Sequence, residues 1–195
     1  MRSVDTVDTV DCKDTPLSCL ARFETGRGTT ADIWVLFDSL PPVSLDAMRG
    51  RWRGTGLPSG HPMDGLLERF GWYGKDFNGA DDVQPLLCKT GRGEVFALNP
   101  ALVPMSIVNR HIRLFHSGFA GALFALLGRA AATSSPTARL RMMEYRDVTT
   151  ATMIYDSLPI FDMFRTVDAD TLLGVMDLRG AEQPFFFVLR RESRP

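Results

Sequence analysis

The sequence predicts a mainly β fold of the α+β class, an antiparallel barrel of about eight strands with added helices. Two observations support this. Strand-like stretches with alternating or β-branched and aromatic residues recur along the chain, at residues 50–54, 72–77, 83–90, 94–98, 138–146, 149–156, 171–178 and 184–191. Turn signals separate several of them, at residues 91–93 (GRG), at Asp147 and at residues 180–183. Short strands joined by tight turns favour a sheet that closes, or nearly closes, on itself.

Composition limits the functional classes. A chain of 195 residues is long enough for one well-buried domain, and 45% hydrophobic with 23% charged residues is ordinary for a globular protein. The 22 basic and 23 acidic side chains give a net charge of −1, so no overall field attracts nucleic acid or an anionic membrane. We expect no nucleic-acid partner.

The N-terminal residues are acidic and lack the apolar core of a signal peptide, which predicts a cytoplasmic protein whose residues 1–28 form a flexible tail. Three cysteines without a Cys-x-x-Cys spacing predict neither a disulfide framework nor a zinc site. The longest apolar stretch, residues 118–128, is too short to span a bilayer. We therefore expect no transmembrane segment.

Residues 29–195 are expected to form a single barrel domain in three parts. In residues 30–100, a helix begins after Thr29 and ends at Pro41, and two helical turns in residues 62–71 precede the strand at 72–77. Residues 101–137 form a helical insert whose longest helix covers residues 105–131. Residues 138–192 supply the C-terminal strands.

The run GRWRG at residues 50–54 carries a resemblance. With FDSLPPVS before it and LPSGHPMDGLLERFGWYGKDF after it, the segment resembles the bacterial family named after its GXWXG motif, and residues 138–192 resemble the domain of unknown function that accompanies it. The motif is similar to the opening strand of calycin barrels, the lipocalin-like class. The resemblance implies that Trp52 packs across the closed end of the barrel beneath Arg190 or Arg191. The alternative is a core tryptophan with both arginines at the surface.

Two acidic residues are candidates for catalysis. If Leu140 and Met142 face inward, a period of two also turns Glu144 inward, where it would act as a general acid or as a polar anchor for a ligand. The alternative places Glu144 at the rim, paired with an arginine of the same strand. Asp177 is the second candidate, on whichever face of residues 171–178 lines the barrel.

Further residues are candidates for ligand binding. His61 follows a glycine-rich turn and is expected near a barrel opening. Asp156 and Asp162 flank a proline turn at a strand end, although Asp156 also suits a purely turn-forming role. The remaining candidates, expected to line an apolar cavity, are Tyr73, Met142 and Phe186.

No cofactor and no metal site are predicted. His111 and His116 are five residues apart, and this spacing does not place two imidazoles on one helical face. Haem held by one histidine, as in haem-binding barrels that share a Gly-x-Trp opening, is the alternative that the resemblance leaves. No nucleotide-binding loop or nucleophile motif is present in the sequence.

The predicted function is the binding of a small hydrophobic molecule, a lipid, terpenoid or aromatic metabolite, inside the barrel. One alternative is an enzyme of the isomerase or cyclase type that uses barrel carboxylates for proton transfer. The other is a structural or interaction module that uses the helix at 105–131. The sequence specifies neither the ligand nor the oligomeric state.

Overall fold

The computed structural model describes residues 15–103 and 128–193. Within them the helices are α1 (Pro16–Glu24), α2 (Thr30–Ser39), α3 (Leu45–Met48) and α4 (Leu66–Arg69), with short 3-10 turns η1 (Pro100–Leu102) and η2 (Gly128–Ala131). The strands are β1 (Gly50–Gly56), β2 (Trp72–Phe77), β3 (Val83–Lys89), β4 (Val95–Ala97), β5 (Ala138–Tyr145), β6 (Val148–Tyr155), β7 (Ile160–Asp168), β8 (Thr171–Leu178) and β9 (Phe185–Arg191). None of the described helices is long and apolar enough to cross a membrane.

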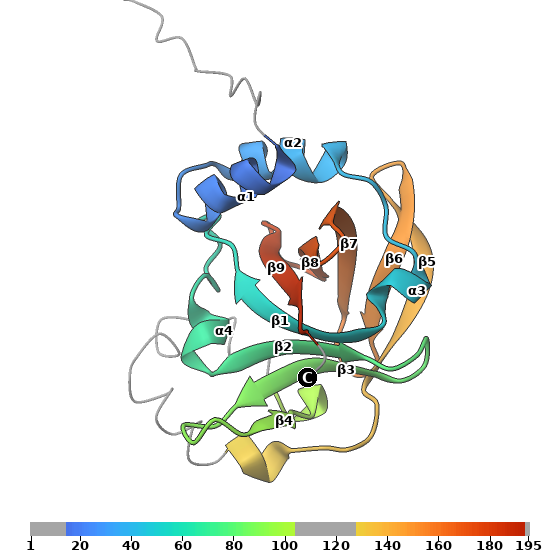
Figure 1. Ribbon diagram of the computed structural model, residues 1–195. Helices are drawn as coiled ribbons and strands as arrows, with labels where there is room; N and C mark the ends of the chain where they lie inside the picture. The colour runs from blue at the N-terminus through green and yellow to red at the C-terminus, as the bar shows by residue number, and fades with distance from the viewer. Residues whose placement is uncertain (1–14, 104–127, 194–195) are drawn as a thin grey trace, which may run out of the picture.

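The predicted mainly β architecture is confirmed. All strand pairs are antiparallel, and the order β1-β9-β8-β7-β6-β5-β3-β2 closes into a ring because β2 pairs with both β3 and β1 (Figure 1). Strand β4 lies outside this ring, paired only to β3 through the hairpin expected at residues 91–93. The predicted helix at 105–131 lies largely outside the described residues, as do His111 and His116.

Strand β7 is the element that the sequence did not predict. It has a charged residue on each face, Asp162 and Arg165, and both are almost fully buried. A half-buried strand is recognised by the alternation of apolar and polar residues. Because charged residues point to both faces of β7, this alternation is obscured. Its pairing with β6 and β8 places β7 in the middle of the C-terminal strands.

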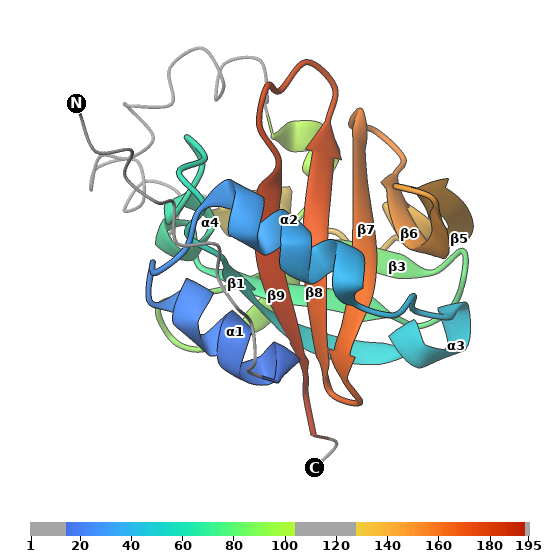
Figure 2. The same ribbon diagram turned by 90° about the horizontal axis from the view of Figure 1, so that it is seen from above.

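Helix α2 lies across the outer face of β7, β8 and β9, and α1 lies next to it on the same side of the sheet (Figure 2). Helix α2 begins as predicted, because Thr29 and Asp32 form a capping box. Residues 16–24 form α1 and not a flexible tail, since Cys19, Leu20 and Phe23 lie on one face that packs against this side of the sheet. Cys19 on this face is disulfide-bonded.

Along each strand, side chains that point into the barrel alternate with side chains that face outward. Phe185, Phe187 and Leu189 of β9 point into it, whereas Phe186 and Val188 face the helices. Two glycines make room for large rings: a Cβ on Gly54 would lie 2.3 Å from the Trp72 ring, and one on Gly174 would lie 2.4 Å from the Phe187 ring. The last glycine of the GXWXG motif thus allows a second tryptophan to enter the barrel.

Gly54→Ala is expected to lower the free energy of unfolding by about 1–3 kcal/mol, as overpacking of a close-packed core does. The Trp72 ring has little freedom to retreat, because its Nε1–H donates to the Gly74 carbonyl at 3.1 Å. Chemical denaturation measures the effect, and Gly79→Ala is the control, since a Cβ there meets no atom within 4 Å. Equal stabilities of the two variants would contradict this packing role.

Candidate functional site

An ion pair between Lys75 of β2 and Asp162 of β7 lies inside the barrel. Lys75 Nζ is 2.8 Å from Asp162 Oδ2, and the two side chains are only 3% and 2% exposed. Lys75 Nζ also donates to the Pro85 carbonyl at 3.1 Å. A buried ion pair commonly contributes less to stability than apolar side chains of the same volume, so its presence in a hydrophobic core suggests a role beyond folding.

Aromatic rings enclose the ammonium group. Lys75 Nζ lies 5.7 Å from the ring centroid of Trp72, 5.6 Å from that of Tyr155 and 5.1 Å from that of Phe187. The hydroxyl of Tyr155 accepts a long hydrogen bond from Lys75 Nζ at 3.5 Å. We call Lys75, Asp162 and Tyr155 the barrel triad.

Burial changes the acidity of two triad members. It raises the pKa of the Asp162 carboxyl, and the neighbouring ammonium of Lys75 opposes this rise. It raises the pKa of the Tyr155 phenol well above its ordinary value, with the Asp162 charge adding to the effect. Asp162 Oδ1 is buried and has no hydrogen-bond partner among the described residues. The triad therefore has an unused acceptor in an apolar environment.

A bulge in β2 brings Trp72 and Lys75 to the same side of the sheet. Trp72 pairs with Cys88 and Gly74 with Leu87, so β2 has one extra residue at this point. Gly74 has φ of 150°, and a Cβ there would lie 1.8 Å from the Trp52 carbonyl oxygen, which restricts this position to glycine. Beyond the bulge, Lys75 and Phe77 alternate inward.

A pocket of about 260 Å³ lies near the Asp162 end of the barrel interior. Its lining includes His61, Met63, Leu178 and the turn between β8 and β9. Leu178 is the register partner of Ile160, which precedes Asp162 by two residues, about 7 Å along the strand. We call this 260 Å³ pocket the mouth pocket.

His61 is held rigidly in the mouth pocket. Its Nδ1 accepts from the Met63 N–H at 3.1 Å, and its ring meets Phe185 edge-on at 5.6 Å between centroids. Burial lowers the pKa of His61, and Asp64 opposes this shift. Asp64 orders the loop by accepting three backbone N–H groups on one carboxylate oxygen. A neutral imidazole therefore borders this pocket near pH 7.

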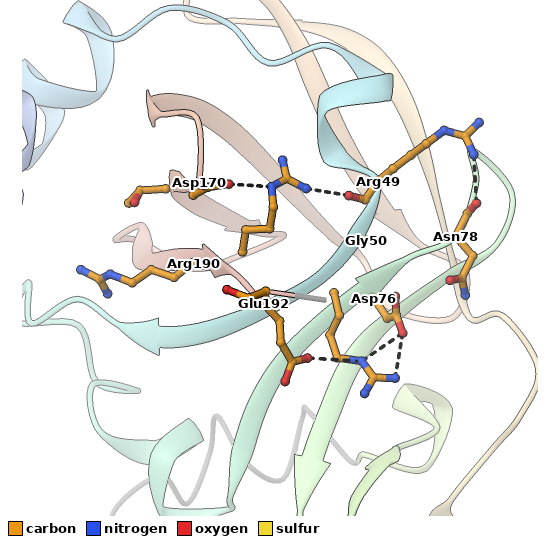
Figure 3. Close-up of a pocket in the computed structure, with 11 residues that line it drawn as sticks. Arg49, Gly50, Asp76, Asn78, Asp170, Arg190 and Glu192 are labelled. Carbon is orange, nitrogen blue, oxygen red and sulfur yellow. Dashed lines mark hydrogen bonds and ion pairs between the residues drawn. The ribbon is translucent and has the colours of Figure 1, made fainter. Parts of the chain in front are cut away.

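The opposite end of the barrel has a larger, polar pocket of about 1170 Å³ (Figure 3). Trp52 lies fully buried beneath Arg191, whose guanidinium is 4.1 Å from the ring centroid and donates to the Ala47 and Arg49 carbonyls. This stacking confirms the implied role of Arg191.

The arginines that line this polar pocket are paired with carboxylates: Arg49 with Asp46, Arg51 with Asp76, Arg190 with Glu24 and Arg191 with Asp170. Because these arginines are paired within the protein, we interpret this pocket as part of the structure that closes the Trp52 end of the barrel.

Of the residues chosen from the sequence, only Asp162 and His61 lie at the triad or the mouth pocket. The inward orientation expected for Glu144 is wrong: Glu144 is exposed, and Met142 is 43% exposed. Both side chains lie on the same face of β5 as Leu140. They are closer than Leu140 to the β5–β6 turn, and at this end of the hairpin the side chains are no longer buried.

The other candidates face away from the interior. Asp177 is exposed on β8, and the exposed Asp156 pairs with Arg139 at 2.5 Å. Tyr73 lies on the outer face, where its hydroxyl donates to Glu192 at 2.5 Å. Phe186 points to α2 and meets Trp34 at 4.9 Å between ring centroids. None of these four side chains lines the interior.

Sequence reasoning missed Lys75 and Tyr155. The available signal was Lys75 two residues before Phe77 in a strand, because a lysine on an apolar face requires a partner. No group of three or more His, Cys, Asp or Glu side chains suited to a metal occurs within residues 15–103 and 128–193.

Comparisons with known proteins agree with this architecture. The family model for GXWXG proteins matches residues 35–93, and that for a domain of unknown function (DUF4334) matches residues 136–191. A crystal structure of a protein from Thermomonospora curvata is 30% identical, with a TM-score of 0.66 over 91% of this chain and 99% of that chain. No curated protein matches. The chain thus belongs to the GXWXG family, with the domain of unknown function forming its C-terminal strands.

Proposed function

We propose that the barrel binds a small, largely apolar molecule, such as a lipid, terpenoid or aromatic metabolite, whose single neutral polar group meets the barrel triad. The observation that carries this proposal is Asp162 Oδ1, a buried carboxylate oxygen without a hydrogen-bond donor among the described residues. Leaving such an acceptor unsatisfied costs about 1–3 kcal/mol or more. A donor on a ligand removes this cost, while the rings around Lys75 supply apolar contact.

The charge of Asp162 selects among possible head groups. A carboxylate ligand would bring a second negative charge to a carboxylate whose Oδ2 already accepts from the ammonium. A hydroxyl or phenol donates to Asp162 Oδ1 without this repulsion. We therefore expect neutral alcohols to bind more tightly than fatty acids of the same length.

Binding of the dye N-phenyl-1-naphthylamine, followed by its fluorescence, tests the proposal. We expect micromolar affinity, with displacement by dodecanol at least about tenfold better than by dodecanoate, the ratio that about 1.4 kcal/mol gives. Correctly folded protein that binds neither the dye nor dodecanol would contradict the proposal.

Two matched pairs of variants locate the site. Met153→Trp fills the interior beside Asp162 and should abolish dye binding, whereas Met142→Trp changes an exposed methionine and should not. Asp162→Asn should remove the preference for dodecanol, while Glu144→Gln, at an exposed carboxylate, should keep it. Melting curves must show that each variant is folded. Equal effects of both members of a pair would place binding elsewhere.

A second candidate function is proton transfer by a barrel carboxylate, as in an isomerase or cyclase. The raised pKa of Asp162 favours it, because a stronger buried base accepts protons better than an ordinary carboxylate. In this candidate function Asp162 is the catalytic carboxylate, the role that the sequence suggested for Glu144 or Asp177. The remaining alternative, an interaction module built on residues 105–131, concerns a segment largely outside the described residues.

A further inference from the structure

The hydrogen-bonding capacity of Lys75 is fully used within the protein. An ammonium group has three donors, and Lys75 Nζ has three acceptors: Asp162 Oδ2 at 2.8 Å, the Pro85 carbonyl at 3.1 Å and the Tyr155 hydroxyl at 3.5 Å. Lys75 therefore has no donor left for a ligand. What a bound molecule meets is determined by the two partners on either side of the ammonium.

Asp162 and Tyr155 have complementary hydrogen-bonding groups that are not used within the described residues. Asp162 Oδ1 can accept and has no donor among the described residues. The Tyr155 oxygen accepts from Lys75, and its O–H has no acceptor within residues 15–103 and 128–193, so it can donate. One acceptor and one donor thus flank the same ammonium, next to the rings of Trp72 and Phe187. The pattern suits a molecule that presents an acidic proton and, close to it, an oxygen that accepts.

We propose that the barrel triad catalyses proton transfer at the carbon next to the carbonyl group of an apolar ketone, with Asp162 as the base and Tyr155 as the donor to the carbonyl oxygen. This rests on the proposed binding function and names its substrate class. Asp162 Oδ1 takes the proton from the carbon, the C–H electron pair forms a C=C bond, and the C=O π pair moves to the oxygen that Tyr155 hydrogen-bonds. Return of the proton to the same carbon, or to a conjugated one, completes exchange or isomerisation without an oxidant or a second substrate.

The environment of the two groups suits these roles. Burial raises the pKa of Asp162, which makes its carboxylate a stronger base, and the Lys75 ammonium opposes this rise. Burial also keeps Tyr155 protonated, as a donor must be. A positioned base typically contributes about 10²–10⁴ in rate, and a donor to a developing oxyanion about 10²–10³. Leu178, the register partner of Ile160, lines the mouth pocket.

Deuterium exchange of the α-protons of 2-tetralone in D₂O, followed by proton NMR, tests the inference with the full-length protein. We expect exchange well above the buffer rate, a loss of at least about 100-fold in Asp162→Asn and a loss of about 10²-fold in Tyr155→Phe. Glu144→Gln and Tyr73→Phe are the matched controls, since both lie on the exposed or outer side of the barrel and should retain full exchange. Tyr155→Phe leaves the Lys75–Asp162 pair intact, so the test does not depend on Asp162→Asn folding.

Displacement of N-phenyl-1-naphthylamine by 2-tetralone separates the two proposals. Binding of 2-tetralone with exchange no faster than in buffer overturns the catalytic inference and leaves the binding function standing. Wild-type exchange rates in folded Asp162→Asn or Tyr155→Phe also overturn it. Failure of the folded protein to bind any apolar probe overturns the binding function as well.

Discussion

Trp52→Ala is expected to lower the free energy of unfolding by about 3–5 kcal/mol, the range for truncating a large buried aromatic residue. Trp52 is fully buried, donates from Nε1 to the Met48 carbonyl at 2.7 Å and lies beneath the Arg191 guanidinium. Its removal leaves a cavity at the closed end and takes away the ring under a cation. For a chain of this size the melting temperature should fall by on the order of 10 °C.

Trp34→Ala is the matched control for this prediction. Trp34 is a half-buried tryptophan of α2 on the outer side of the barrel, so its truncation should cost clearly less. Calorimetry or chemical denaturation of both variants measures the difference. If Trp52→Ala melted at the wild-type temperature, Trp52 would have no part in closing the barrel.

Lys75→Met should destabilise the protein by about 3–5 kcal/mol, because it leaves the Asp162 carboxylate buried without its cation. The loss should depend on pH. Without Lys75 the pKa of Asp162, already raised in the folded state, rises further above its value in the unfolded chain. A raised folded-state pKa means stability that is lost as pH rises through that value, so the deficit should be larger at pH 8 than at pH 5.

The double variant Lys75→Met with Asp162→Leu should regain most of this stability, since replacing a buried ion pair with apolar residues is often neutral or stabilising by about 1–4 kcal/mol. Urea denaturation at both pH values measures each variant. Lys89→Met, at an exposed lysine of β3, should stay within about 0.5 kcal/mol of the wild type. A double variant as unstable as Lys75→Met would show that the two side chains do not act as a pair.

The double variant also separates structure from function. If the double variant is stable but no longer distinguishes dodecanol from dodecanoate, the ion pair serves ligand recognition and not stability. If it is stable and its ligand selectivity is unchanged, the barrel triad has no role in recognition.

Much of the architecture was predictable because its causes are local. The start of α2 follows from Thr29 and the capping Asp32, and the β3–β4 hairpin follows from the glycines at residues 91 and 93. Strands β8 and β9 could be recognised because each is a short run of mainly apolar residues that is buried on both faces. The position of Arg191 over Trp52 followed from resemblance to a known fold, since neither residue indicates the other locally.

The site depended on contacts that no local pattern contains. Lys75 and Asp162 are 87 residues apart, and the Gly74 bulge determines which β2 residues share the barrel side with Lys75. Alternation alone placed Glu144 inside, but a strand buries its residues only where neighbours cover it, and the β5–β6 hairpin ends near that position. The sequence by itself determined most of the strands and their turns, because these follow from near-neighbour chemistry. Only the closed ring of strands decided which charges meet in the interior, because burial is a property of the whole barrel and not of one strand.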